Sequence, residues 1–307
     1  MNNTVWTTEQ IPDLAHKTII VTGGNSGLGY ESVKAFAEKG AKVIMACRSV
    51  EKGEAAKAEI GAVKGQIKVM PLDLQDFASI EKFATDFKSE NQQLDILLNN
   101  AGIMTTPYFK TKDGLEGQMG TNHFGHFKLT SLLLDLIVKT PKSRVVSVSS
   151  MAHKQGKMNF DNLMFENGGY SPMKSYGRSK LSNLLFTYEL QRKFDEYNID
   201  SIAVAAHPGV ASTNLAQYMK EKFITRLFVP LFSLIGQKPA MGALPQIRAA
   251  VDETVKGGDY FGPHKGMRGN PIKVESNKSS HNKADAEKLW LASEKTTKED
   301  FSEKFKA

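Results

Sequence analysis

Cysteine is almost absent from this chain of 307 residues, and its scarcity excludes several classes of protein. The single Cys47 cannot form a disulfide within the chain, and no multi-cysteine metal site exists. The histidines are scattered along the chain, so no metal is predicted. The N-terminal residues also lack the basic-then-apolar pattern of a signal peptide, so we predict a cytoplasmic protein.

Long apolar runs are missing as well. The most apolar stretch, Leu227–Ile235, is about half of the ~20 residues that a membrane-spanning helix needs, and Pro230 interrupts it. No membrane span is therefore predicted. We interpret residues 211–240 as an insertion that forms a substrate lid, with contact between residues 223–235 and a membrane surface, or packing as a short core helix, as alternatives.

Basic blocks and linkers are also lacking. The formal net charge is +7, but Lys and Arg are interspersed with acidic residues, which predicts a solvated charged surface and no nucleic-acid partner. No segment rich in Pro, Gly or Ser divides the chain, so a single domain is predicted.

Short apolar runs recur along the chain, with helical patterns between them. Most runs are continuously apolar, as in strands that helices cover on both faces. This order predicts an α/β fold with a doubly wound parallel sheet. The predicted strands are Thr18–Thr22, Lys42–Ala46, Ile67–Pro71, Asp95–Leu98, Arg144–Val148 and Ser201–Ala205, followed by a loop and a last strand within Asp259–Val274.

Helices are predicted from apolar stripes and end signals. Gly40 is a stop signal after a stripe that includes Val33 and Phe36, and Asp76 is placed to cap the next helix. The remaining predictions are helices around Ser175–Phe194 and Asn282–Ser293 and an amphipathic insertion at Leu215–Ala240.

A glycine-rich turn follows the first strand, with Gly23, Gly27 and Gly29 in the pattern Gly-x3-Gly-x-Gly. Glycines permit a tight turn, and they let backbone N–H groups and a helix N-terminus approach a pyrophosphate. At the end of the second strand, where an NAD site carries an acidic residue, this chain has Arg48. A guanidinium binds a ribose 2′-phosphate, so the predicted cofactor is NADP(H), with Ser49 and Lys52 as assisting residues.

Tyr176 and Lys180 are four positions apart, which places them on one face of a helix. A phenol is a poor base at neutral pH, and a nearby ammonium lowers its pKa toward the working range. This spacing also arises by accident, so the pair by itself is weak evidence.

The motifs in order resemble the short-chain dehydrogenase/reductase family over nearly the whole chain. They are Thr22-Gly-x3-Gly-x-Gly29, Asp73, Asn99-Asn100-Ala101-Gly102, Asn122, Ser149-Ser150, Tyr176-x3-Lys180 and Pro208-Gly209. The resemblance implies a Rossmann-type fold and hydride transfer between NADP(H) and a small-molecule carbonyl/alcohol pair.

The resemblance also implies individual roles. Tyr176 would be the general acid/base, Lys180 would lower its pKa and hold the nicotinamide ribose, Ser150 would bind the substrate oxygen, and Asn122 would hold a relay water. The implied cofactor-binding residues are Gly23, Asn25, Ser26, Gly27, Leu28, Gly29, Arg48, Ser49, Asp73, Leu74, Asn99, Ala101, Gly102, Tyr176, Lys180, Pro208, Gly209, Val210 and Thr213. For Asn99 and Asn100, a role in bracing the sheet is an equally open interpretation.

Within the family, the chain looks most like the retinol-dehydrogenase-like branch, on motifs such as Ala46-Cys47-Arg48 and Asn122-His123-Phe124-Gly125-His126. A long segment between Ser150 and Tyr176 carries apolar side chains that could wall a roomy apolar pocket, so an apolar aldehyde or ketone is the expected substrate. The apolar side chains are Met158, Phe160, Leu163, Met164, Phe165 and Tyr170. Family members often form dimers or tetramers, and the assembly of this chain is left open.

Three alternative functions are compatible with parts of this pattern. A sensor or scaffold that binds NADP without turnover is one, although such proteins commonly lose the tyrosine or lysine. An epimerase or dehydratase of the extended branch typically carries Gly-x-x-Gly-x-x-Gly, which differs from the turn here. A light-driven protochlorophyllide reductase would carry additional cysteines.

Overall fold

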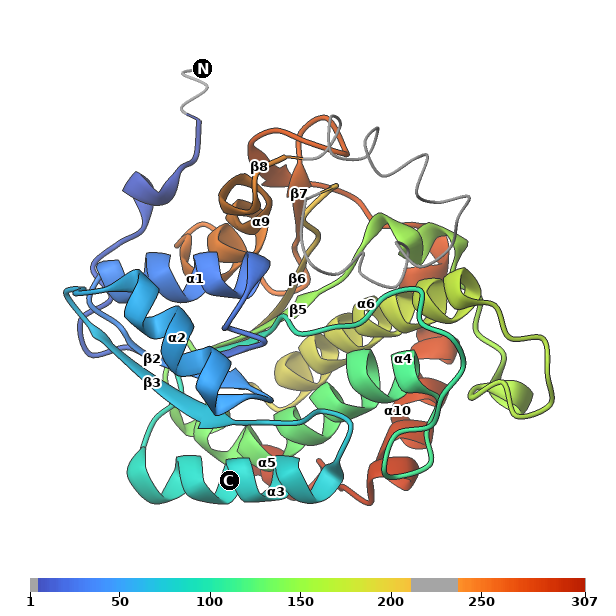
Figure 1. Ribbon diagram of the computed structural model, residues 1–307. Helices are drawn as coiled ribbons and strands as arrows, with labels where there is room; N and C mark the ends of the chain where they lie inside the picture. The colour runs from blue at the N-terminus through green and yellow to red at the C-terminus, as the bar shows by residue number, and fades with distance from the viewer. Residues whose placement is uncertain (1–4, 211–236, 307) are drawn as a thin grey trace.

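The structure, a computed structural model, describes residues 5–210 and 237–306. The described strands form one sheet in the order β3-β2-β1-β4-β5-β6-β7-β8 (Figure 1). All neighbouring strands run parallel except β7 and β8, which are antiparallel. The strands are β1 (Thr18–Thr22), β2 (Lys42–Cys47), β3 (Gln66–Pro71), β4 (Ile96–Asn99), β5 (Arg144–Val148), β6 (Ile202–Ala206), β7 (Tyr260–Pro263) and β8 (Pro271–Lys273).

The predicted α/β fold is confirmed, and so are the six predicted strands, with boundaries that shift by at most one residue. The continuous apolar runs have the predicted cause, because every residue of β1 is buried and successive side chains enter different cores. Ile19 and Val21 belong to one core cluster, and Ile20 belongs to the other. The single strand expected within Asp259–Val274 is instead a pair, β7 and β8.

Helices cover both faces of the sheet (Figure 1). One core packs α1 and α9 against the sheet, and the other packs α3, α5 and α6 against the opposite face. The helices are α1 (Gly27–Glu38), α2 (Val50–Ile60), α3 (Phe77–Glu90), α4 (Gly117–Met119), α5 (Gly125–Lys139), α6 (Pro172–Glu196), α9 (Pro239–Val251) and α10 (Lys283–Thr297). The doubly wound architecture therefore follows from burial on both faces.

The predicted helix signals work as expected. The Asp76 carboxylate accepts hydrogen bonds from the N–H groups of Ala78 and Ser79 and so caps α3. Gly40, with φ of +98°, follows the end of α1. Asn282 caps α10, whose observed range begins one residue later and extends to Thr297.

The C-terminal residues pack over α5 and α6. Trp290 of α10 stacks on Phe186, and Phe301 lies against both Trp290 and Phe127.

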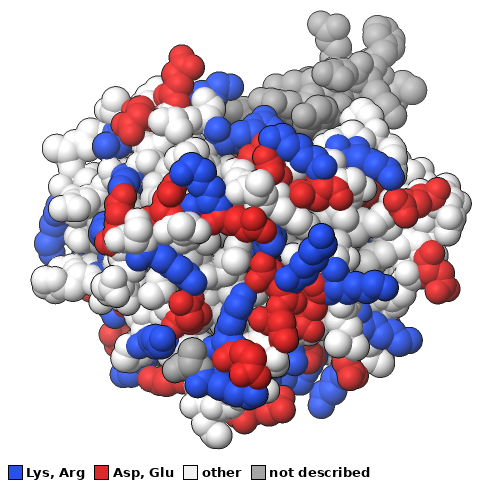
Figure 2. Space-filling model, turned by 90° about the horizontal axis from the view of Figure 1, so that it is seen from below, with Lys and Arg blue, Asp and Glu red and all other residues white. Residues whose placement is uncertain are grey.

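The surface of the protein carries charges of both signs, and Figure 2 shows them interspersed on the face seen from below. Lys88 of α3 pairs with Asp135 of α5 at 2.6 Å, for example. This mixture agrees with the predicted solvated surface.

The predicted lid lies almost entirely outside the described residues. Of the insertion at 211–240, only residues 237–240 are described, and there α9 begins at Pro239. The membrane-contact and core-helix alternatives for residues 223–235, and the insertion at Leu215–Ala240, are likewise untested. Within residues 5–210 and 237–306, no helix combines the length and apolarity that crossing a membrane requires.

Candidate active site

The site lies where the strand order reverses. In the sheet, β1 lies between β2 and β4. The connection after β1 runs to one side of the sheet and the connection after β4 runs to the other, so a crevice opens at the carboxyl ends of these two strands. Two neighbouring cavities of about 280 and 190 Å³ lie there. They share Gly23, Ala101 and Gly102 as lining residues, so together they form one cleft.

The geometry of the turn after β1 requires glycine at several positions. A Cβ on Gly29 would lie 2.2 Å from the Gly23 carbonyl oxygen, and Gly23 and Gly27 have φ of +64° and +54°. Ser26 precedes α1 but makes no side-chain cap, so the first-turn N–H groups of α1 are available to an anion. Ser26, Gly27, Leu28 and Gly29 line the second cavity. These residues fit a pyrophosphate.

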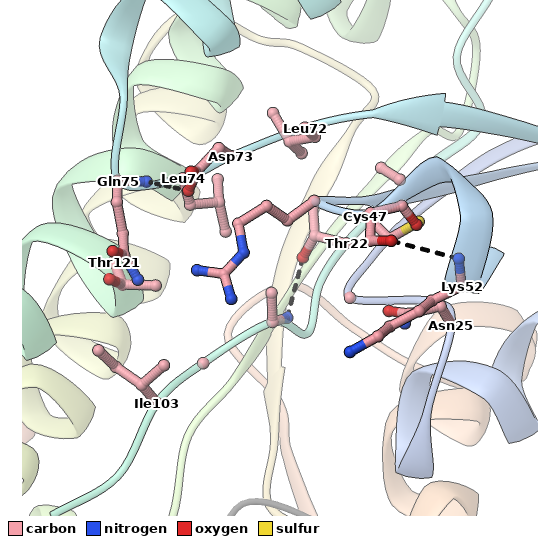
Figure 3. A pocket seen from close by; sticks show the side chains of 16 residues that line it. Thr22, Asn25, Cys47, Lys52, Leu72, Asp73, Leu74, Gln75, Ile103 and Thr121 are labelled. Carbon is pink, nitrogen blue, oxygen red and sulfur yellow. Dashed lines mark hydrogen bonds between the residues drawn. The ribbon is translucent and has the colours of Figure 1, made fainter. Parts of the chain in front are cut away.

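The first cavity carries the residues that were predicted to select the cofactor, Arg48, Ser49 and Lys52. Three further predicted cofactor-binding residues, Asn25, Asp73 and Leu74, also line it. In Figure 3, Asn25 and Lys52 lie on one side of the cavity, across from Asp73 and Leu74. The Ser49 hydroxyl accepts a hydrogen bond from the Lys52 N–H at 3.3 Å, so Ser49 also caps α2.

The Asn99–Gly102 turn is tied to the end of β1 by Thr22. The Thr22 hydroxyl accepts hydrogen bonds from the N–H groups of Asn100 and Ala101, each at 2.9 Å, and the Asn100 amide donates to the Thr22 carbonyl at 2.7 Å. Asn99 is 2% exposed, donates to Thr130 and lines neither cavity. Its side-chain nitrogen therefore braces the sheet, while its side-chain oxygen has no hydrogen-bond partner among the described residues, and contact with the cofactor stays a prediction.

Tyr176 lies at the second cavity and is almost completely buried. Burial raises the pKa of its phenol to about 12, and the Ser150 hydroxyl offsets only part of that rise. The neighbouring Ser149 lines the second cavity, and its hydroxyl donates to the Lys180 carbonyl at 2.8 Å. Ser149 thus ties the end of β5 to α6, and the role of Ser150 in binding the substrate oxygen stays a prediction.

Lys180 is buried beside Tyr176, and burial lowers its pKa to about 8. The ammonium donates to the Val148 carbonyl at 3.0 Å and lies 5.8 Å from the centre of the Tyr176 ring. The expected lowering of the Tyr176 pKa by Lys180 is not found in this structure. Desolvation of the phenol dominates, because the ammonium is directed at the strand carbonyl.

Asn122 lies in a π-helical turn, Gly120–Phe124, which leads into α5. Its side chain accepts from the Ile103 N–H at 2.8 Å and donates to the Ile103 carbonyl and the Ser179 hydroxyl, each at 2.9 Å. Asn122 therefore clamps the loop after β4 to α6, next to Lys180. Its role in holding a water stays a prediction.

The Pro208–Val210 segment follows β6. Pro208 lines the second cavity, and Gly209 has φ of +68°. The Val210 N–H donates to the Met267 carbonyl at 2.8 Å. The predicted ligand Thr213 lies outside the described residues.

The long segment before Tyr176 packs mainly against the rest of the protein. Met158, Phe160 and Leu163 pack against a cluster of α6 and α10 side chains, and Phe165 stacks on the Arg178 guanidinium. Arg178 also donates to carbonyls of this segment. None of the six named apolar side chains lines either of the two cavities, and their predicted role in a substrate pocket stays a prediction.

Sequence reasoning missed Gln246 of α9, which donates to the Asn100 side chain at 2.9 Å and so supports the turn that Thr22 holds. No local pattern reveals this contact, because the partners are far apart in the chain. The site thus combines a glycine turn that fits a dinucleotide with a buried tyrosine–lysine pair, a combination that defines a nicotinamide-dependent oxidoreductase.

Comparisons with known proteins agree. The family model for the short chain dehydrogenase matches residues 17–223. Mouse retinol dehydrogenase 12 is 40% identical over 291 residues, 94% of this chain and 87% of that protein. Human retinol dehydrogenase 14 is 39% identical over 305 residues, 92% of this chain and 87% of that protein.

A solved structure shares the whole fold. That of an uncharacterized protein from Mycobacterium paratuberculosis has a TM-score of 0.82 and 40% identity, and the match covers 97% of this chain and 99% of that one. The chain belongs to the short-chain dehydrogenase/reductase family, in its retinol-dehydrogenase-like branch. It is an oxidoreductase of the alcohol/carbonyl pair of a small molecule, with a nicotinamide cofactor.

Proposed function

We propose that the protein reduces an apolar aldehyde or ketone with NADPH, and that Tyr176 donates the proton. The observation that carries this proposal is the buried Tyr176–Lys180 pair, which lines the cavity next to the glycine turn. With a pKa raised to about 12, Tyr176 is protonated at neutral pH, which is the form that donates a proton in the direction of reduction.

Each group at the site would have a separate role in the reaction. NADP(H), when bound, supplies or accepts the hydride. The Ser150 and Tyr176 hydroxyls would meet the developing alkoxide, and burial keeps water away from it. The Lys180 ammonium supplies a positive charge, and Asn122 holds the surrounding loop in place.

Selection of NADP(H) over NAD(H) rests on Arg48. It is exposed at the cavity wall, where Lys52 also lies, and neither Glu51 nor Glu54, the first acidic residues after β2, lines this cavity to repel a 2′-phosphate. An apolar substrate is supported by the names of the similar mouse and human proteins, since retinol is a largely apolar alcohol. The sensor alternative is weaker because the four groups of the reaction are all present.

The test measures oxidation of NADPH at 340 nm across a panel of aldehydes and ketones of graded length, beside NADH and a Tyr176→Phe variant. We expect turnover of apolar substrates, a preference for NADPH, and a loss of about 10²–10⁴-fold in kcat for Tyr176→Phe at unchanged NADPH affinity. Tight NADPH binding without turnover of any substrate would favour the sensor, and turnover of polar sugars alone would exclude the apolar substrate.

A further inference from the structure

His126 is a buried histidine that the reaction scheme does not use. It lies at the start of α5, one turn beyond Asn122, and is 3% exposed. One ring nitrogen, Nε2, is 2.9 Å from the Thr22 hydroxyl, and the other, Nδ1, is 3.1 Å from the Asn122 carbonyl oxygen. The ring thus bridges β1, which carries the glycine turn, and the π-helical turn, which carries Asn122.

The hydrogen bonds of Thr22 determine the tautomer. A hydroxyl offers one hydrogen and two acceptor positions. Both acceptor positions of Thr22 are taken by the N–H groups of Asn100 and Ala101. The remaining hydrogen points to His126 Nε2 at 2.9 Å in preference to the Leu98 carbonyl at 3.4 Å. Nδ1 of His126 therefore carries the ring hydrogen and donates it to Asn122.

The charge state is consistent with this assignment. Burial, together with the nearby Lys180 ammonium, lowers the pKa of His126 to about 4, although its contact with Asn122 works in the opposite direction. The ring is therefore neutral at physiological pH, and Nε2 can accept the Thr22 hydrogen. A protonated ring would present a second donor to Thr22, which has no acceptor position left.

Each end of the bridge meets a different part of the site. Thr22 holds the Asn100–Gly102 turn, which lines both cavities. Asn122 holds Ile103 and Ser179, and Ser179 precedes Lys180. We propose that His126 is a positioning residue that aligns the cofactor cradle with the catalytic helix α6 through these two hydrogen bonds. This inference rests on the proposed function.

Two variants separate the two hydrogen bonds. The His126→Gln amide reaches about as far as Nε2, so it can keep Thr22 and lose Asn122, whereas His126→Asn reaches only as far as Nδ1 and does the reverse. We expect His126→Asn to weaken NADPH binding about tenfold and His126→Gln to lower kcat about tenfold with near-normal NADPH binding. NADPH binding is measured by fluorescence titration, which does not depend on turnover.

His123 provides a matched control. It is also buried, in the same π-helical turn, but its ring contacts the Ser293 hydroxyl of α10 at 2.8 Å, away from the cleft. His123→Gln is expected to lower the melting temperature while leaving kcat and NADPH binding of the folded enzyme unchanged. A merely structural His126 would behave in the same way, and that result would overturn the inference.

Thr22 supplies a second route if a His126 variant fails to fold. Thr22→Val removes the hydrogen bond to His126 together with those from Asn100 and Ala101, so it should weaken NADPH binding at least as much as His126→Asn does, and Thr22→Ser should restore binding. The Thr22→Val/His126→Asn double variant should lose no more than Thr22→Val alone, because Thr22→Val already breaks the hydrogen bond that His126→Asn removes. Additive losses would overturn the inference. A wild-type protein without turnover would overturn the proposed function, while the binding titrations would still decide the Thr22–His126 coupling.

Discussion

The two ends of the cleft use charge in opposite ways. At the first cavity, Arg48 and Lys52 are exposed to solvent. At the second cavity, Tyr176 and Lys180 are buried, and burial moves the pKa of Tyr176 up to about 12 and that of Lys180 down to about 8. Solvated charges can recognise a ligand at little cost to the fold, whereas buried ionisable groups gain altered proton chemistry and destabilise the fold.

Burying the Lys180 ammonium is not required for hydrogen bonding within the fold. The Val148 carbonyl that accepts from Lys180 also accepts from the Asn183 amide at 3.0 Å. Lys180 is therefore not needed to satisfy that carbonyl. This makes Lys180 a residue whose charge serves the reaction more than the fold, and the contrast with Arg48 can be tested directly.

The largest expected effect is on activity at the buried end. Lys180→Met keeps the length of the side chain and removes the ammonium. We expect kcat to fall by about 10²–10⁴-fold because the proton donor loses its charged neighbour. The 340 nm assay measures this loss, and circular dichroism shows whether the fold is kept. A folded Lys180→Met enzyme with near-normal kcat would contradict the contrast between the two ends.

The same variant should gain stability at neutral pH. The folded pKa of Lys180, about 8, is depressed below its ordinary 10.5, so the unfolded chain holds the proton more tightly. The wild type should therefore be less stable than Lys180→Met by about 3 kcal/mol at pH 7, and by only about 1 kcal/mol at pH 10, where the folded lysine is neutral. Urea unfolding at both pH values measures the difference. If the difference in unfolding free energy were the same at both pH values, burial of the charged lysine would not be the cause of the lower stability of the wild type.

The smallest expected effect is at the exposed end. Arg48→Gln should weaken NADPH binding by about 10–100-fold, leave NADH binding and the melting temperature unchanged, and reduce the sensitivity of NADPH binding to salt. Lys57→Gln, in the same helix α2 as Lys52 but outside the cavity lining, is the matched control. Equal losses for NADPH and NADH would contradict the assignment of Arg48 to the 2′-phosphate.

Much of this site was accessible from the sequence because its signals are local. Glycines in a tight turn, Asp76 as a cap and a tyrosine four positions before a lysine depend on backbone geometry that neighbouring residues share. The assignments that failed or stayed open depend on distant partners. The prediction that the segment before Tyr176 walls a pocket stays open, and what the structure adds is its contacts with Arg178, α6 and α10.

The sequence by itself determined the order of strands and helices and the glycine turn, because periodicity and short-range geometry encode them, whereas the groups predicted for the catalytic centre came from the family resemblance. Only the tertiary structure decided that the Ser149 hydroxyl bonds to the Lys180 carbonyl, that Lys180 is directed at Val148, and that β8 runs antiparallel. Those outcomes depend on burial and on hydrogen bonds between residues far apart in the chain, and these arise only when both sides of the sheet have been covered.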